Sequence, residues 1–196
     1  MLNRLRPLVL SLALLLGFLS GVGWAETPAL RVAVLENSPP MSYRDANGKL
    51  TGFSHAVISA VCEELKTRCE FLVVSLERVV EDLVLGEYDI AAVSLLDTPE
   101  RRKKVLFAKP YFRSLSLWFA QPGVAPGHPG VRIAVVKGSA QERYAVQQNW
   151  LTVGVPTNGQ LGEPLSAGVA QAAIIPMSSA LNLQKYKNLQ HLGRVS

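Results

Sequence analysis

The chain alternates short apolar runs with amphipathic stretches. The run at 30–35 (LRVAVL) is rich in branched side chains and predicts a buried strand. Further apolar runs predict strands at 70–74, 88–94 and 112–120. Amphipathic stretches between these runs predict helices at 55–66 and 78–85. Strands that alternate with helices favour parallel sheets covered on both faces, so the sequence predicts an α/β fold.

Turn and capping signals mark the ends of several of these elements. Asn47-Gly48 is typical of a hairpin turn. Ser54 can cap the helix at 55–66, and Thr98-Pro99 can open a short helix because proline is favoured at the first helical position. The apolar stripe expected on the helix at 55–66 consists of Val57, Val61 and Leu65.

A segment rich in proline and glycine divides the chain. Six of the ten residues at 121–130 are Pro or Gly, which is the clearest linker signal in the sequence. After it, strands are expected at 131–136, 151–155 and 170–176, and helices at 140–148 and 178–186. The pattern predicts a first lobe at 26–120, a crossover or hinge at 121–130 and a second lobe at 131–196. A cleft between two such lobes would bind a small molecule.

Residues 1–25 resemble an export signal. Arg4 and Arg6 precede an apolar run of about 16 residues, and Gly23 and Ala25 provide the small side chains of a cleavage site. The alternative is a retained anchor, although the run is shorter than the roughly 20 residues needed to span a bilayer. Cleavage after Ala25 would leave 18 basic and 15 acidic residues, a mild net charge of +3, and would place the protein in the periplasm.

Composition narrows the functional classes. Hydrophobic residues make up 48% and charged residues 18% of the 196-residue chain, which excludes a disordered tail or a coiled coil. The three histidines lie far apart, and no nucleophile or metal motif is visible, so no catalytic residue, metal or cofactor is predicted. The basic run at 101–104 has no interleaved aromatic residues, so no nucleic-acid partner is expected.

The two cysteines, Cys62 and Cys69, lie seven positions apart. Nearby cysteines usually pair in an oxidising compartment. A bridge across so short a loop would contribute about 2 kcal/mol. Two buried free thiols are the alternative.

Five motifs in the first half occur in a familiar order. They are Pro40 to Tyr43, Gly48 to Phe53, Leu83 to Asp89, Thr98 to Arg101 and Phe107 to Tyr111. In the second half, Lys137 to Glu142 provides a weaker match. This order resembles the periplasmic solute-binding proteins of the polar amino-acid ABC transporter family, that is, bacterial extracellular solute-binding proteins, family 3. The resemblance implies a two-lobed, type II periplasmic-binding-protein-like fold, here with an incomplete second lobe.

The resemblance assigns roles to three polar residues. Arg101 would grip the ligand's α-carboxylate, and Ser94 and Ser139 would line the site. A cation at a helix start is itself unfavourable by about 0.3–1 kcal/mol, and an anionic ligand would compensate for it. The alternatives are a solvated surface arginine and two serines with ordinary capping or turn roles. Asp89 is expected to bond the backbone rather than to act as a catalytic acid.

Four positions depart from the family pattern. Pro176 stands where an acidic residue usually pairs with the ligand's ammonium. Ser38 and Leu76 replace sandwiching aromatic residues, and Leu96 replaces a hydroxyl. These changes favour a carboxylate without an ammonium, or a site that no longer binds a small ligand. The chain also ends at Ser196 without the return crossing of its relatives, which predicts a fragment or a shortened protein.

The leading hypothesis is therefore a monomeric, exported solute-binding protein that presents a carboxylate-bearing ligand to an ABC transporter permease. A sensory or accessory protein of the same fold, acting with a sensor kinase or a dehydrogenase, is the alternative. A dehydratase-like enzyme is the third hypothesis. Arg101 would then clamp the substrate, and Glu36, Asp97 or Glu142 would act as the acid.

Overall fold

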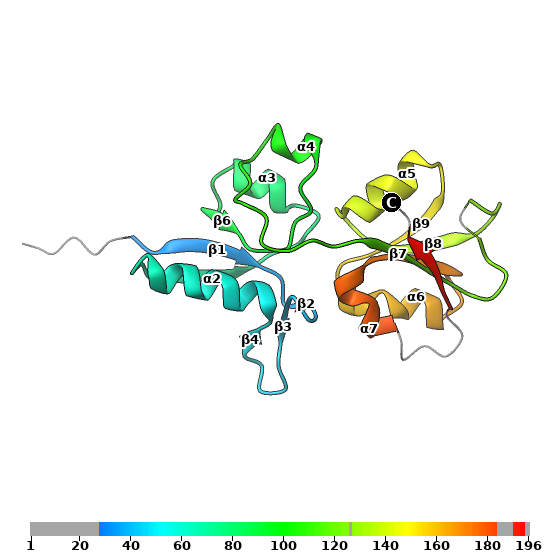
Figure 1. Cartoon of the computed structure of the whole chain (residues 1–196), viewed down its shortest axis with the longest axis horizontal. Coiled ribbons are helices and arrows are strands. Elements are labelled where there is room, and N and C mark those ends of the chain that lie inside the picture. Colours follow the sequence, from blue (N-terminus) through cyan, green and yellow to red (C-terminus); the bar gives the residue numbers. More distant parts are fainter. Residues whose placement is uncertain (1–27, 126, 184–189, 195–196) are drawn as a thin grey trace, which may run out of the picture.

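The computed structural model describes residues 28–125, 127–183 and 190–194, which form two lobes side by side (Figure 1). The predicted signal segment at 1–25 and the end of the helix expected at 178–186 lie outside the described residues. In the part of the chain that the structure describes, no helix has the length and apolar character needed to cross a membrane.

The first lobe contains a three-stranded parallel sheet in the order β5-β1-β6. Its strands are β1 (Leu30–Val34), β5 (Cys69–Val73) and β6 (Ile90–Ala91). Helix α2 (Phe53–Glu64) covers one face, and α3 (Val79–Val84) and α4 (Pro99–Arg102) lie on the other (Figure 1). Because side chains alternate along a strand, Val32 and Val34 of β1 pack toward α2 while Ala33 packs toward α3.

Helix α2 begins differently from the prediction. Its N-cap is Gly52, and Ser54 lies inside the first turn with a fully buried side chain. The buried row is Ser54, Ile58 and Cys62, and not the predicted stripe. Val61 and Leu65 are 40% and 57% exposed. The predicted stripe is wrong because the serine hydroxyl finds a polar partner in Ser94, which lets a polar residue occupy the inner face.

A small antiparallel sheet projects from the first lobe. It consists of β2 (Asn37–Ser38), β3 (Ser42–Arg44) and β4 (Leu50–Thr51). The predicted turn at Asn47-Gly48 joins β3 to β4, and Gly48 has a φ of 77°. Asp45 stabilises this turn, because one carboxylate oxygen accepts from the amides of Asn47 and Lys49 at 2.9 Å.

The second lobe is a five-stranded sheet in the order β11-β7-β10-β8-β9. Its strands are β7 (Ser116–Ala120), β8 (Arg132–Val136), β9 (Leu151–Val155), β10 (Ala172–Pro176) and β11 (Gln190–Arg194). Strands β8, β9 and β10 are parallel, whereas β7 runs antiparallel to β10 and β11. Helix α5 (Ala140–Gln147) covers one face, and α6 (Gly162–Ser166) and α7 (Ala180–Leu183) cover the other (Figure 1). Short 3-10 turns occupy Asn158–Gln160 and Met177–Ser179.

The expected boundary between the lobes is wrong. Residues 112–120 were expected to end lobe 1, but β7 pairs along its whole length with β10 of the second sheet. The chain therefore crosses before Ser116, and the described residues of the Pro/Gly-rich segment, 121–125 and 127–130, lie between β7 and β8 (Figure 1). The apolar pattern correctly predicted a strand within 112–120, but the residues of a strand do not identify the strand with which it pairs.

Candidate functional site

A cavity of about 470 Å3 lies between the two lobes. The structure brings all six residues singled out as candidate ligand contacts to its wall, together with Pro176. From the first lobe these are Ser38, Leu76, Ser94, Leu96 and Arg101, and from the second lobe Ser139. Most of the wall is apolar, with Leu35, Met41, Val93, Val105 and Ile174 among the lining residues. An apolar cavity with a few polar groups is typical of a small-molecule site.

Arg101 is a buried cation held by two carbonyl groups. Thr98 caps the short helix α4, and Arg101 is its third residue, only 5% exposed. Its Nη1 donates to the carbonyl of Leu96 at 2.8 Å, and its Nη2 donates to the carbonyl of Gly138 in the second lobe, also at 2.8 Å. The alternative of a solvated surface arginine is therefore wrong.

Burial dominates the electrostatics of Arg101. Loss of hydration, with a smaller contribution from nearby Arg143, lowers the pKa of Arg101 to about 10, which still leaves the guanidinium charged at neutral pH. Among the described residues, no carboxylate forms an ion pair with it, and its buried Nε lacks a hydrogen-bond partner. A buried charge without a direct ion-pair partner is costly, and the attraction of Glu81 and Glu100 offsets only part of that cost, so an anionic ligand here would be favoured.

Gly138 lets the second lobe approach the first. Its φ is 73°, and a Cβ at this position would lie 2.8 Å from the carbonyl oxygen of Leu76. The loop is fixed by two hydrogen bonds with the first turn of α5. Ser139 Oγ accepts from the Glu142 amide at 3.0 Å, and a Glu142 carboxylate oxygen accepts from the Gly138 amide at 2.7 Å. The Ser139 oxygen thus caps α5, while its hydroxyl proton remains able to donate into the cavity.

Ser94 occupies a special backbone position. Its φ of 53° lies in the left-handed region, which is uncommon for a residue other than glycine. Its hydroxyl lies 2.5 Å from the hydroxyl of Ser54 on α2. This contact connects the cavity wall to the sheet-facing row of α2, and strained positions of this kind tend to occur at ligand sites.

Asn158 is a cavity residue that the sequence did not reveal. It follows the carboxyl end of β9, and its Nδ2 donates to Ser38 Oγ of the first lobe at 3.4 Å. Its buried Oδ1 has no hydrogen-bond partner in the part of the chain that the structure describes. The position after a parallel strand is the usual place for ligand contacts, and that signal was available in the sequence.

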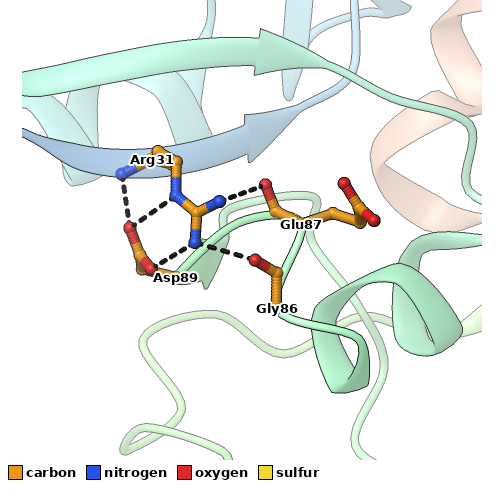
Figure 2. A network of polar contacts seen from close by, with 4 residues as sticks. All are labelled: Arg31, Gly86, Glu87 and Asp89. Atoms are coloured by element: carbon orange, nitrogen blue, oxygen red, sulfur yellow. Dashed lines mark hydrogen bonds and ion pairs between the residues drawn. The ribbon is translucent and has the colours of Figure 1, made fainter.

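Two carboxylates of the described residues line the cavity, and each is engaged by an arginine of its own lobe. Asp97 pairs with Arg102. Asp89 pairs with Arg31, whose backbone amide donates to it at 2.8 Å and whose Nη2 lies 2.9 Å from it (Figure 2). The expectation that Asp89 bonds the backbone is confirmed. The same guanidinium also donates to the carbonyls of Gly86 and Glu87, so it joins β1 to the turn before β6 (Figure 2).

The cysteine pairing is confirmed. Cys62 on α2 and Cys69 at the start of β5 form a disulfide, with their Cα atoms 6.1 Å apart. It ties the helix to the edge strand of the first sheet and lies apart from the residues that line the cavity.

Comparison with known proteins agrees with this geometry. The family model of bacterial extracellular solute-binding proteins, family 3, matches residues 30–150. The L-arginine-binding protein of Pseudomonas aeruginosa is 27% identical over 146 residues, covering 72% of this chain and 56% of that protein. The ABC transporter arginine-binding protein 1 of Escherichia coli is 29% identical over 149 residues, covering 74% of this chain and 60% of that protein.

Solved structures show the same fold. An ancestral arginine-binding protein bound to arginine matches with a TM-score of 0.77 at 23% identity, covering 86% of this chain and 80% of that one. The two-lobed type II periplasmic-binding-protein fold is therefore confirmed. The chain spans less than two thirds of the length of the curated relatives named above. With more than half of its residues matched by the family model, the chain belongs to the bacterial extracellular solute-binding proteins, family 3.

Proposed function

We propose that this protein captures a small carboxylate-bearing solute between its lobes, outside the cytoplasm, for an ABC transporter permease. The observation that carries the proposal is Arg101. It is buried in a cavity between the lobes, its carbonyl partners come from both lobes, and none of the described carboxylates forms an ion pair with it. The relatives named as arginine-binding proteins of ABC transporters support the transport role.

Closure of the lobes would couple ligand capture to a change of shape. Among the described residues, two side-chain hydrogen bonds cross between the lobes, from Arg101 to Gly138 and from Asn158 to Ser38. Arg101, Asn158 and Ser38 line the cavity, and Gly138 precedes the lining residue Ser139. A ligand between the lobes would therefore be held by the same surfaces that hold the lobes together. Closure of two lobes about a hinge is a common way to enclose a ligand.

The three acids considered for a dehydratase-like reaction are engaged in other contacts. Glu36 pairs with Arg44 at 2.7 Å, and Asp97 pairs with Arg102. Glu142 caps the loop before α5. A general acid must be free to exchange a proton with the substrate, so these contacts favour binding over a dehydratase-like reaction.

A thermal-shift screen with matched variants tests the proposal. The purified chain would be melted with amino acids, dicarboxylates and monocarboxylates, and hits would be measured by calorimetry. A ligand at a hundredfold over its dissociation constant adds about 2.7 kcal/mol of stability. We expect Arg101→Met to abolish the shift, whereas Lys103→Met, an exposed cation at the end of the same helix, keeps it. A cooperatively melting chain that no carboxylate stabilises would contradict the proposal.

A further inference from the structure

Two residues of the cavity wall each contain a buried side-chain atom that lacks a hydrogen-bond partner, and the two atoms differ in character. Arg101 Nε is a cationic donor, and Asn158 Oδ1 is a neutral acceptor. Within the described residues neither has a partner, and unsatisfied buried polar atoms are rare in folded proteins. A buried polar atom without a hydrogen bond lowers the stability of the fold. A ligand that presents an acceptor to Arg101 Nε and a donor to Asn158 Oδ1 would remove this cost at both atoms.

The other residues of the cavity wall determine whether the ligand's donor group is charged or neutral. An ammonium group enclosed in a cavity needs an opposite charge, because burial of an unpaired charge costs far more than burial of a neutral polar group. The two carboxylates that line this cavity, Asp89 and Asp97, are each paired with an arginine. A hydroxyl needs only the neutral acceptor that Asn158 provides.

The remaining surface determines the body of the ligand. Leu76, Leu96 and Pro176 present apolar groups to the same space. These side chains offer no hydrogen bond to a polar substituent. Binding of an apolar group against them is favourable, because it removes apolar surface from water. The complementary molecule therefore has one anionic end, one neutral donor and an apolar remainder.

We propose that the ligand is a hydroxy carboxylate with an apolar side chain, in which a neutral hydroxyl stands where an α-amino acid has its ammonium. The carboxylate bonds Arg101, and the hydroxyl donates to Asn158 Oδ1. This assignment rests on the proposed function, because it assumes that Arg101 binds the carboxylate of the ligand. It adds the identity of the group that binds Asn158.

Three acids with one carbon skeleton test it directly. Calorimetric titrations of the purified full chain would compare leucine, 2-hydroxy-4-methylpentanoate and 4-methylpentanoate. A second series with a larger body would compare phenylalanine, 3-phenyllactate and 3-phenylpropanoate. In the better-fitting series we expect the hydroxy acid to bind at least tenfold more tightly than the amino acid and more tightly than the unsubstituted acid.

A charge placed at Asn158 should reverse this preference. In Asn158→Asp, a carboxylate replaces the neutral acceptor, so the affinity ratio should shift toward the amino acid by at least tenfold. The matched control is Asn149→Asp, which adds the same charge at an exposed position of the same lobe and should leave the ratio unchanged. Asn158→Ala removes the acceptor and should bring the hydroxy acid within about threefold of the unsubstituted acid.

The outcomes separate the two proposals. An amino acid that binds the unaltered chain as tightly as its hydroxy analogue overturns this inference and leaves the proposed function intact. A folded chain that binds no member of either series overturns both. A hydroxy-acid preference that survives Asn158→Ala overturns the role of Asn158. If Asn158→Asp does not melt cooperatively, the titrations of the unaltered chain and of Asn158→Ala decide the matter.

Discussion

Arg101 Nη2 donates to the carbonyl oxygen of Gly138 at 2.8 Å, and these two atoms belong to different lobes. The guanidinium of this cavity-lining residue thus also forms one of the hydrogen bonds that hold the lobes together. Its Nη1 is fixed to Leu96 in the first lobe, so its orientation is set from both sides.

Arg101→Lys separates the effect of charge from that of geometry. A lysine keeps the positive charge, but its single ammonium cannot replace the planar fork that bonds Leu96 and Gly138 and still faces a ligand. We expect a carboxylate ligand to bind about 10- to 100-fold more weakly, as measured by calorimetry. Unchanged affinity would show that charge alone is sufficient and that the two carbonyl bonds do not position the group.

Gly138→Ala tests the close approach of the lobes. The new methyl group would lie 2.8 Å from the Leu76 carbonyl oxygen, in addition to the strain of a left-handed φ, which costs about 1–3 kcal/mol. Gly130→Ala is the matched control. Gly130 has a similar φ of 78° but no atom within 4 Å of the added Cβ. We expect both variants to melt lower, and only Gly138→Ala to lose at least tenfold in ligand affinity. Equal losses would contradict the interlobe contact.

The ion pair in Figure 2 predicts a dependence of stability on pH. The Arg31 guanidinium, through its hydrogen bonds, holds the pKa of Asp89 below its usual value. A depressed pKa in the folded state gives stability that is present above the unfolded value near 3.9 and is lost as the pH falls through the folded value. Asp89→Asn should therefore lower the melting temperature at pH 7, and the difference should shrink below about pH 4.

Glu87→Gln is the control for that experiment. Glu87 contributes its carbonyl oxygen to the network, while its carboxylate points away from Arg31 (Figure 2). Melting curves at pH 7, 5 and 3 should show little difference between this variant and the unaltered chain. A pH-independent effect of Asp89→Asn would show that the loss comes from hydrogen bonds rather than from charge.

Removal of the disulfide should destabilise the first lobe. Pairing of Cys62 with Cys69 closes a short loop, for which the chain-entropy estimate is about 2 kcal/mol. We expect the double variant Cys62→Ala/Cys69→Ala to lose about that free energy of unfolding in a denaturant titration. Reduced, unaltered protein should behave in the same way. A variant that equals the oxidised protein would show that the bridge constrains the unfolded chain less than its spacing implies.

The sequence predicted most elements because local signals decide them. The apolar run of β1, the Asn47-Gly48 turn and the Thr98-Pro99 helix start all depend on neighbouring residues. The motif order also identified Arg101 and the serines of the cavity wall. Local patterns, however, say little about partners distant in the chain.

Three misses share that cause. β7 was expected in the first lobe, but it pairs with β10, which begins only at Ala172. Ser54 was expected as a cap, but it bonds Ser94 across the lobe. Asn158 was missed although it follows a predicted strand, because its hydrogen bond to Ser38 joins residues that lie far apart in the sequence. In each case a tertiary contact overrides the local signal.

The position of β7 has a consequence for how the chain folds. The first sheet needs only residues up to Ala91, so it can form while the rest of the chain is still being made. β7 comes next, but it must wait for β10 and β11, and such long-range pairing forms slowly. Trp118 and Phe119, 1% and 6% exposed in the finished lobe, are uncovered during that interval. One lobe is then complete while an apolar strand next to it is still exposed, and an exposed strand of this kind is prone to aggregation.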